Sequence, residues 1–245
     1  MLAMRILILS DIHGNNLALD AVLAHAPDFD ATWCLGDMVG YGPGPNECVK
    51  RLRQLPELIC LSGNHDHAAL GLIPLSRFNQ EASWVVEWTS QNLSQETVDF
   101  LQALPATATV GDFTLAHGSP REPVWEYIME PRIAQLNFDE FSTPYSLVGH
   151  SHFPLIFHRP EYDGPTVPIA VKGEQTTNLS PRMILNPGSV GQPRDMDPRA
   201  SYALLDTEAK TWEIRRVPYD IERVQALILE AGLPARQALR LNEGW

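Results

Sequence analysis

Residues 149–152 read Gly-His-Ser-His and directly follow the apolar run Tyr145–Val148. The same arrangement, an apolar run followed at once by residues that can bind metal, occurs at four earlier places in the chain. The four earlier polar stretches are Asp11-Ile12-His13, Gly36-Asp37, Gly63-Asn64-His65-Asp66 and His117-Gly118. The runs before them are 5–9, 32–35, 58–61 and 113–116. Continuous apolar runs bounded by turn residues are typical of strands that are covered on both faces.

The carboxyl ends of these predicted strands are expected to meet at one edge, because ligands of open α/β sheets gather there. The candidate metal ligands at that edge are Asp11, His13, Asp37, Asn64, His117, His150 and His152. Imidazole and carboxylate groups together bind divalent transition metals. A single stretch of this kind is weak evidence, but five in order at predicted strand ends are not. Seven ligands are more than one ion needs. The sequence therefore predicts a two-metal centre.

This ordered set resembles the calcineurin-like metallophosphoesterases, whose pattern is Asp-x-His, Gly-Asp, Gly-Asn-His-Asp or Glu, His, and Gly-His-x-His. The resemblance covers residues 5–158. A later stretch, 186–194, resembles a loop of the small bacterial and archaeal phosphodiesterase-like branch and extends the likeness to about residue 206. The family's fold implies an α/β protein, a four-layer αββα sandwich of two mixed β-sheets flanked by helices.

The resemblance also implies a role for each ligand. Asp11, His13 and His152 would hold one metal, Asn64, His117 and His150 the second, and Asp37 would bridge them. Two divalent ions per chain are expected, Mn first and Fe, Zn, Ni, Co or Mg as alternatives. A hydroxide bridging the metals would attack the phosphorus. His150 and His152 are expected on an extended chain, which would point both imidazoles to one side.

Two further residues carry catalytic expectations. The resemblance makes His65 a general acid that protonates the leaving oxygen and does not bind metal. Asp66 would either orient His65 or cap a turn or helix, and the sequence leaves both readings open. Weaker substrate-binding candidates are Asn15, Tyr41, Asn186, Ser189 and Arg194. Arg194 could bind a phosphate oxygen in a bidentate way, whereas Asn-Pro-Gly-Ser is also ordinary turn chemistry.

The chain alternates predicted strands and helices in its first third and reads as a single domain over residues 1–245. Helices are predicted at 17–25, from Asn46 to about 55, at 131–139 and at about 220–232. A helical insertion at about 68–104 is expected to hold two helices, the second capped by Ser94. Its aromatic stripe favours packing, with a cap over the active site as the alternative. Further strands are predicted at 108–110, 154–157, 166–171, 182–185, 202–205 and 212–217.

Bulk composition narrows the function. The formal net charge of -12 disfavours nucleic acid and anionic membranes as partners. Three cysteines form no framework and no apolar stretch is long enough to span a membrane, so a cytoplasmic location is expected. The leading hypothesis is a hydrolase of small phosphate diesters or monoesters, with a second copy of the chain as a candidate partner in a homo-oligomer. The alternatives are a protein serine/threonine phosphatase, a diadenosine tetraphosphate hydrolase, and a catalytically silent scaffold.

Overall fold

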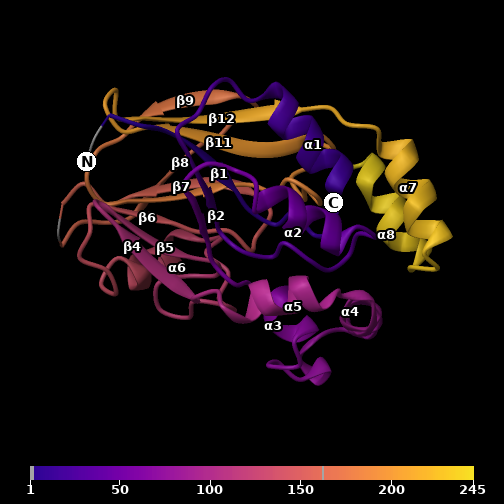
Figure 1. Ribbon diagram of the computed structural model, residues 1–245. Coiled ribbons are helices and arrows are strands. Elements are labelled where there is room, and N and C mark those ends of the chain that lie inside the picture. The colour runs from indigo at the N-terminus through magenta and orange to yellow at the C-terminus, as the bar shows by residue number, and fades with distance from the viewer. Residues whose placement is uncertain (1–2, 162) are drawn as a thin grey trace.

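A computed structural model describes residues 3–161 and 163–245 as a sandwich of two sheets (Figure 1). Its strands are β1 (Arg5–Leu9), β2 (Ala31–Cys34), β3 (Leu58–Cys60), β4 (Thr107–Val110), β5 (Phe113–Ala116), β6 (Tyr145–Leu147), β7 (Pro154–His158), β8 (Val167–Ile169), β9 (Gln175–Asn178), β10 (Met183–Pro187), β11 (Ala200–Asp206) and β12 (Thr211–Val217). Its helices are α1 (Asn16–His25), α2 (Pro45–Leu52), α3 (Asn64–Ala69), η1 (Leu75–Arg77), α4 (Gln80–Asn92), α5 (Gln95–Gln102), α6 (Pro131–Asn137), α7 (Ile221–Glu230), α8 (Ala235–Leu239) and η2 (Arg240–Asn242).

Both sheets are six-stranded and mixed. The first has the order β3-β2-β1-β11-β12-β9 and the second the order β4-β5-β6-β10-β7-β8. Strands β1, β2 and β3 run parallel, as do β5, β6 and β10, while β11 and β7 run antiparallel to their neighbours. The α/β class and the two mixed sheets are therefore confirmed.

Strand β1 contributes apolar side chains to both of its faces. Ile6 and Ile8 face the second sheet, where they join a buried cluster with Trp33, Leu115 and Leu147. The intervening Leu7 and Leu9 face the other way, into a cluster that includes residues of α1 and α2. Successive strand residues point to opposite faces, so one strand serves both layers. A third cluster packs α6 on the outer face of the second sheet.

The parallel strands place the predicted ligand loops together. The loops after β1, β2 and β3 start at neighbouring points, because these strands are paired in register up to Leu9, Cys34 and Cys60. In the second sheet β5 and β6 are likewise parallel and in register, and the loops after them carry the later histidines. The expected convergence of strand ends follows from this topology.

The segment between β3 and β4 contains the two predicted helices, α4 and α5, and Ser94 caps α5 by accepting a hydrogen bond from the Thr97 amide. It also contains α3, which was not predicted and begins at Asn64, so two site residues lie on a helix. Strand β9, helix α8 and η2 were also missed. Helix α2 begins at Pro45 with Gly44 at the cap position, two residues before the predicted cap Asn46.

The C-terminal helices cover one end of the sandwich, away from the N-terminal end in Figure 1. Val224 and Ile228 of α7 and Leu241 of η2 pack with Val85 of α4 in a separate buried cluster. The segment between β3 and β4 is therefore joined to the C-terminus. This contact bears on the site, because α4 and α8 both approach it.

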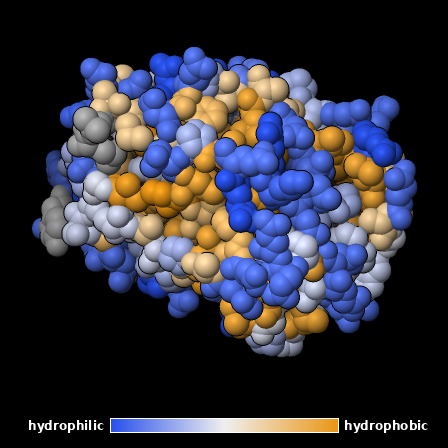
Figure 2. Space-filling view, viewed as in Figure 1, coloured by the Kyte–Doolittle hydropathy of each residue, from blue (hydrophilic) through white to orange (hydrophobic). Residues whose placement is uncertain are grey.

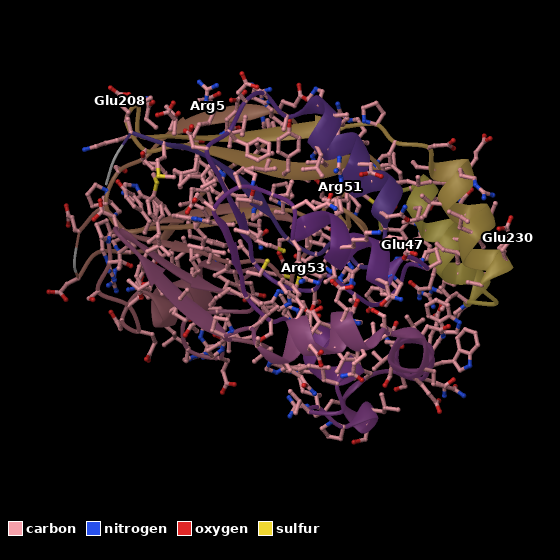
Figure 3. The ribbon with its side chains drawn as sticks, in the orientation of Figure 1. Arg5, Glu47, Arg51, Arg53, Glu208 and Glu230 are labelled. Atoms are coloured by element: carbon pink, nitrogen blue, oxygen red, sulfur yellow. The ribbon has the colours of Figure 1, made fainter. Side chains whose placement is uncertain are left out.

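Charged side chains lie mainly on the outside. Arg51 and Arg53, at the end of α2, are labelled with other charged residues in Figure 3 and pair with Asp20 and Glu96. These two arginines thus lie at the solvated end of a helix. Figure 2 shows hydrophobic side chains among the hydrophilic ones across the middle of this face. In the described part of the chain, helices are all too short or too polar to cross a membrane.

Candidate metal centre

The ligand loops have an unusual backbone. Asp11, His13, Asp37, His150 and His152 all have positive φ angles, at 53°, 50°, 54°, 64° and 63°. Such left-handed conformations are uncommon for residues other than glycine and concentrate at functional sites. The expectation of an extended chain at His150 and His152 is wrong. Left-handed turns, not strand alternation, aim these two side chains.

The first ligand cluster contains Asp11, His13 and His152, all buried. The Nε2 atoms of His13 and His152 are 3.1 Å apart, and His152 Nε2 is 3.3 Å from Asp11 Oδ1. The other carboxylate oxygen, Oδ2, accepts hydrogen bonds from the Ser10 hydroxyl and the His150 amide. Asp11 therefore keeps one oxygen for the protein and turns the other toward two imidazoles.

The second cluster contains Asp37, His117 and His150. His117 Nε2 lies 3.3 Å from Asp37 Oδ2 and 3.2 Å from Asn64 Oδ1. Asp37 Oδ1 accepts the His65 amide, while Asp37 Oδ2 also lies 3.6 Å from His13 Nε2. One oxygen of Asp37 thus faces both clusters. All seven predicted ligands converge, and the shared position expected for Asp37 is present.

Two observations show that these residues fit a pair of cations. Asp11 Oδ1 and Asp37 Oδ2 are buried without a hydrogen-bond partner. Buried carboxylate oxygens without a partner are costly, and a cation would satisfy both. The surrounding donors are imidazole nitrogens and one amide oxygen, which suit borderline divalent metals.

Backbone carbonyls fix the imidazoles. The Nδ1 atoms of His13, His117 and His152 lie 3.1, 2.9 and 2.5 Å from the carbonyl oxygens of Val39, Leu35 and Gln192. A ring nitrogen that donates to a carbonyl leaves the other nitrogen with a lone pair for metal. The three Nε2 atoms are therefore the ligand atoms.

Two glycines are required by close approach. A Cβ on Gly63 would lie 2.1 Å from Asp37 Oδ1. A Cβ on Gly149 would lie 2.0 Å from Ser10 Oγ and 3.0 Å from Asp11 Oδ2. Any side chain at either position would displace a carboxylate of the centre. The Gly-Asn-His-Asp and Gly-His-x-His motifs begin with glycine for this reason.

Burial and charge set the protonation of the ligands. Burial lowers the pKa of His13, His150 and His152 well below the usual range, which keeps these rings neutral. Burial also acts to lower the pKa of His117, but the Asp37 carboxylate outweighs it and raises that pKa to about 9. Without metal, a protonated His117 thus balances the charge of Asp37. Metal binding replaces that proton.

His65 lies beside the ligands. Its ring contacts the rings of His13 at 4.9 Å and Tyr41 at 4.4 Å, measured between centroids. Its Nδ1 is buried, lies against Gly40 and has no hydrogen-bond partner. Burial lowers the pKa of His65 to about 4, so the ring is neutral at neutral pH. The remaining ring nitrogen, Nε2, is the one available to a substrate.

Asp66 does not orient the His65 ring, which was one of the two roles considered from the sequence. Its carboxylate accepts four backbone N–H groups, from Asp37, Met38, Val39 and Gly63. These bonds cap helix α3 and tie it to the loop that carries Asp37. The geometry therefore favours the capping alternative and corrects the expectation of a catalytic Asp66.

Three of the five substrate-binding candidates have other partners. Buried Asn15 caps α1 and donates to the Gly191 carbonyl. Asn186 donates to the Gly149 carbonyl, and Ser189 donates to the Asp11 carbonyl. These side chains hold the ligand loops in place, which corrects the expectation that they bind substrate.

Tyr41 and Arg194 remain beside the open side of the site. Tyr41 contacts the His13 ring, and the charge of Arg194 acts on His13, His65 and His152. Arg194 Nη2 also donates to Gln192 Oε1 over 3.0 Å. Both positions are consistent with the expectation that they face the substrate.

Sequence reasoning missed the aromatic side of the site. Phe78, just before α4, contacts the His65 ring at 5.3 Å and the Trp125 ring at 5.3 Å. Tyr127 stacks on His150, with centroids 3.8 Å apart and planes 17° apart. Phe78 brings the start of the insertion next to His65, while Trp88 of the aromatic stripe packs against the C-terminal helices. The segment 118–130 carries no motif that would have indicated its position beside the metal ligands.

Comparisons with known proteins agree with this geometry. Residues 4–210 match the calcineurin-like phosphoesterase superfamily domain. The uncharacterized protein MJ0912 of Methanocaldococcus jannaschii is 35% identical over 98% of both chains.

Solved structures are similar along nearly the whole chain. The crystal structure of a metallophosphoesterase from Sphaerobacter thermophilus is 45% identical, with a TM-score of 0.91, over 99% of this chain and 100% of that one. The hypothetical protein PH1004 from Pyrococcus horikoshii shares the fold, with a TM-score of 0.80 and 19% identity over 98% of both chains.

Proposed function

This chain belongs to the calcineurin-like phosphoesterase superfamily, and from that premise we propose that it is a dinuclear metal-dependent hydrolase of small phosphate diesters or monoesters. The observation that carries the proposal is the pair of buried ligand clusters facing one oxygen of Asp37. That oxygen and Asp11 Oδ1 have no hydrogen-bond partner among the described residues, and two cations would satisfy both.

The ligands divide between the two ions as the clusters do. One ion would be held by Asp11, His13 and His152, the other by Asn64, His117 and His150, with Asp37 shared. Bound divalent ions supply an activated water nucleophile at neutral pH and positive charge for the phosphate oxygens. The protein contributes fixed ligand geometry, because each carboxylate and three of the imidazoles are held by hydrogen bonds on the side away from the centre.

His65 and Arg194 act on the substrate in this proposal. His65 Nε2 donates a hydrogen bond to the leaving oxygen, since the ring is neutral and Nδ1 is enclosed against Gly40. Arg194 binds a non-bridging phosphate oxygen through its guanidinium, which Gln192 already orients. Neither residue is needed to hold metal.

Small substrates are favoured by the walls of the site. Phe78 and Trp125 pack edge to face beside His65, and Tyr127 stands against His150. These rings narrow the approach to the centre from the side of the insertion. The net charge of -12 further disfavours long polyanions such as duplex DNA.

A metal-reconstitution screen tests the proposal. Protein stripped by a chelator is loaded with Mn, Fe, Zn, Ni, Co or Mg, and bound metal is measured alongside hydrolysis of bis-p-nitrophenyl phosphate and p-nitrophenyl phosphate. We expect about two ions per chain and hydrolysis that depends on them, with Mn among the active metals. Two bound ions without hydrolysis of any phosphoester would support the silent scaffold. Failure to bind metal would overturn the proposal.

A further inference from the structure

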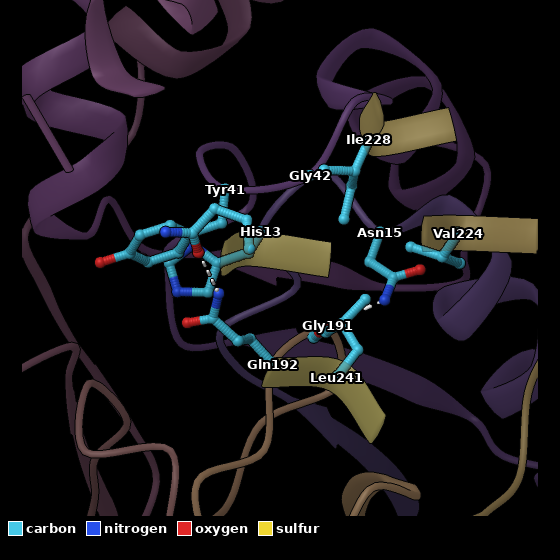
Figure 4. Close-up of a pocket in the computed structure, with 10 residues that line it drawn as sticks. His13, Asn15, Tyr41, Gly42, Gly191, Gln192, Val224, Ile228 and Leu241 are labelled. Atoms are coloured by element: carbon cyan, nitrogen blue, oxygen red, sulfur yellow. Dashed lines mark hydrogen bonds between the residues drawn. The ribbon is translucent and has the colours of Figure 1, made fainter. Parts of the chain in front are cut away.

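The two ligand clusters are backed by different parts of the chain. Figure 4 shows His13 of the first cluster and Gln192 at a small pocket, which is also lined by Val224, Ile228 and Leu241 of the C-terminal helices. The first cluster therefore rests on loops that pack against α7 and η2. The second cluster has no such backing at one of its ligands, the ring of His150.

His150 is held by a segment without regular secondary structure. Its Nε2 atom lies 3.2 Å from the carbonyl oxygen of Trp125, and its ring stacks on Tyr127. Both residues lie in the segment 118–130, which is fully described and contains no helix or strand. A carbonyl oxygen only accepts hydrogen bonds, so Nε2 carries the hydrogen and Nδ1 keeps its lone pair. His150 thus offers Nδ1 to the second ion, whereas the other three imidazoles offer Nε2.

The Trp125 carbonyl belongs to a turn that lies against Gly118, the residue after the ligand His117. The Glu122 carbonyl accepts the Trp125 and Glu126 amides over 3.2 and 3.3 Å. A Cβ on Gly118 would lie 2.8 Å from Trp125 N and 2.9 Å from Glu126 N. Any side chain at position 118 would therefore displace the turn, together with the carbonyl that holds a metal ligand.

The carboxylate of Glu126 fixes this turn to the rest of the protein. Its Oε2 accepts hydrogen bonds from Ser119 Oγ and Asn137 Nδ2, both over 2.8 Å, and Arg121 donates to both of its oxygens. Burial acts to raise the pKa of Glu126, but these hydrogen bonds outweigh it and hold the pKa below its ordinary value. The group is therefore ionised, and Asn137 connects it to the end of α6.

We propose that Glu126 is a positioning residue of the second metal site, which acts through the Trp125 carbonyl on the orientation of the His150 ring. Groups that orient a metal-binding imidazole typically contribute about 10–100-fold to metal affinity. The affinity for the second ion should therefore depend on Glu126, while the first ion, whose imidazoles are held by other carbonyls, should not depend on it. The inference rests on the proposed function for the presence of metal, but the orientation of His150 is a property of the metal-free protein.

Nitrogen NMR of the histidine rings tests the orientation without metal. In chelator-treated protein with isotope-labelled histidine, we expect His150 in the Nε2–H tautomer, with its signals identified by their loss in His150→Gln. Glu126→Gln places an amide NH₂ among groups that themselves donate, so the turn should loosen and the two nitrogens of His150 should approach an averaged signal. The matched control is Glu122→Gln, an exposed glutamate of the same turn, which should keep the wild-type spectrum.

Metal titration connects the orientation to the second ion. Mn is titrated calorimetrically into metal-free protein, and the affinities of the two binding steps are compared. Glu126→Gln should weaken one step by about tenfold or more and leave the other within twofold, whereas Glu122→Gln should leave both within twofold. At a Mn concentration that fills both wild-type sites, electron paramagnetic resonance should show coupled ions in wild type and isolated ions in Glu126→Gln. Thermal melting verifies that each variant is folded.

The outcomes separate the positioning role from the proposed function. If the tautomer of His150 and one Mn affinity depend on Glu126 but no phosphoester is hydrolysed, the positioning role stands and the proposed function falls. An unchanged tautomer in Glu126→Gln, or an equal weakening of both binding steps, would overturn the positioning role. If Glu126→Gln does not fold, Asn137→Ala decides, because it removes one donor to Glu126 from outside the segment. An unchanged tautomer and unchanged Mn affinities in that variant would likewise overturn it.

Discussion

Two regions meet at the active site and are built differently. The metal edge consists of the strand-end loops 10–15, 36–41, 62–66, 117–118 and 149–152, and its ligands are buried. The proposed substrate wall consists of Phe78, Trp125, Tyr127 and Arg194, which come from irregular segments. Tyr127 remains 46% exposed. Short local motifs thus encode the candidate metal ligands, whereas tertiary packing assembles the proposed substrate wall.

The largest effect is expected at the centre of the metal edge. Asp37→Asn keeps the shape of the side chain but removes the charge that faces both clusters. Phosphoesterase activity should fall by about a thousandfold or more, since the shared ligand supports both ions. Elemental analysis should show fewer than two metals per chain. The control Asp20→Asn, an exposed carboxylate, should match wild type. Full metal content with normal turnover in Asp37→Asn would remove the basis of a dinuclear site.

The second effect separates metal binding from hydrogen bonding to the leaving oxygen. His65→Ala should reduce turnover by roughly a hundredfold, as when one hydrogen-bond donor to a developing negative charge is removed, while the metal content stays unchanged. His67→Ala is the matched control, because His67 lies on the same helix and hydrogen bonds to Ser62 instead of facing the centre. The two variants are compared by kcat and by bound metal. Parallel loss of metal and activity in His65→Ala would place His65 among the ligands.

A smaller effect is expected at Gln237, where the C-terminal segment contacts the loop that carries Gln192. Gln237→Leu removes the hydrogen bonds to Gln192 and Glu81, so Arg194 and the C-terminal segment should lose their fixed positions. We expect KM to rise about fivefold, from hydrogen bonds worth about 1 kcal/mol each, with kcat little changed. Gln225→Ala, which removes a bond to the Ala238 carbonyl within the same segment, is the control. An equal fall in kcat with constant KM would show that Gln237 acts on the metal edge instead.

The smallest effect concerns pH and metal removal. The folded pKa of His117, about 9, lies above its ordinary value of 6.5. Its contribution to stability is therefore complete below about 6.5 and is lost as the pH rises through about 9. Between pH 7 and 9.5 the metal-free protein should lose roughly 2–3 kcal/mol of stability. Metal-loaded protein should not show this loss, because metal replaces the proton.

Thermal melting at both pH values, with and without chelator, measures this difference. His117→Gln is the matched variant, since it lacks the titrating ring. Its metal-free form should be equally stable at pH 7 and 9.5. A loss of stability with pH that persists in His117→Gln would assign the effect to another group.

Most of the metal edge could be predicted from the sequence. The ligands follow apolar runs, and parallel pairing brings the ends of such runs together whatever the details of the loops. The failures there concern conformation: His150 and His152 are left-handed, not extended, and Asn64 begins a helix. Local sequence patterns do not distinguish these backbones.

The substrate wall could not be predicted in this way. Tyr127 lies in the segment 118–130, which carries no motif and no periodic pattern. Asn15, Asn186 and Ser189 failed for a related reason, since their polar groups hold neighbouring loops. A polar residue near a motif is equally suited to supporting the site and to touching the substrate, and only its partners decide between them.

The left-handed backbone at five ligand positions also limits which amino acids can serve there. Aspartate, asparagine and histidine adopt this conformation several times more readily than other residues with side chains. Glutamate and cysteine bind metals too, but they do not share that tolerance. Exchanging Asp11 or Asp37 for glutamate would therefore strain the turn as well as lengthen the side chain. The composition of the metal site is thus determined by the backbone at the strand ends as much as by the chemistry of the ions.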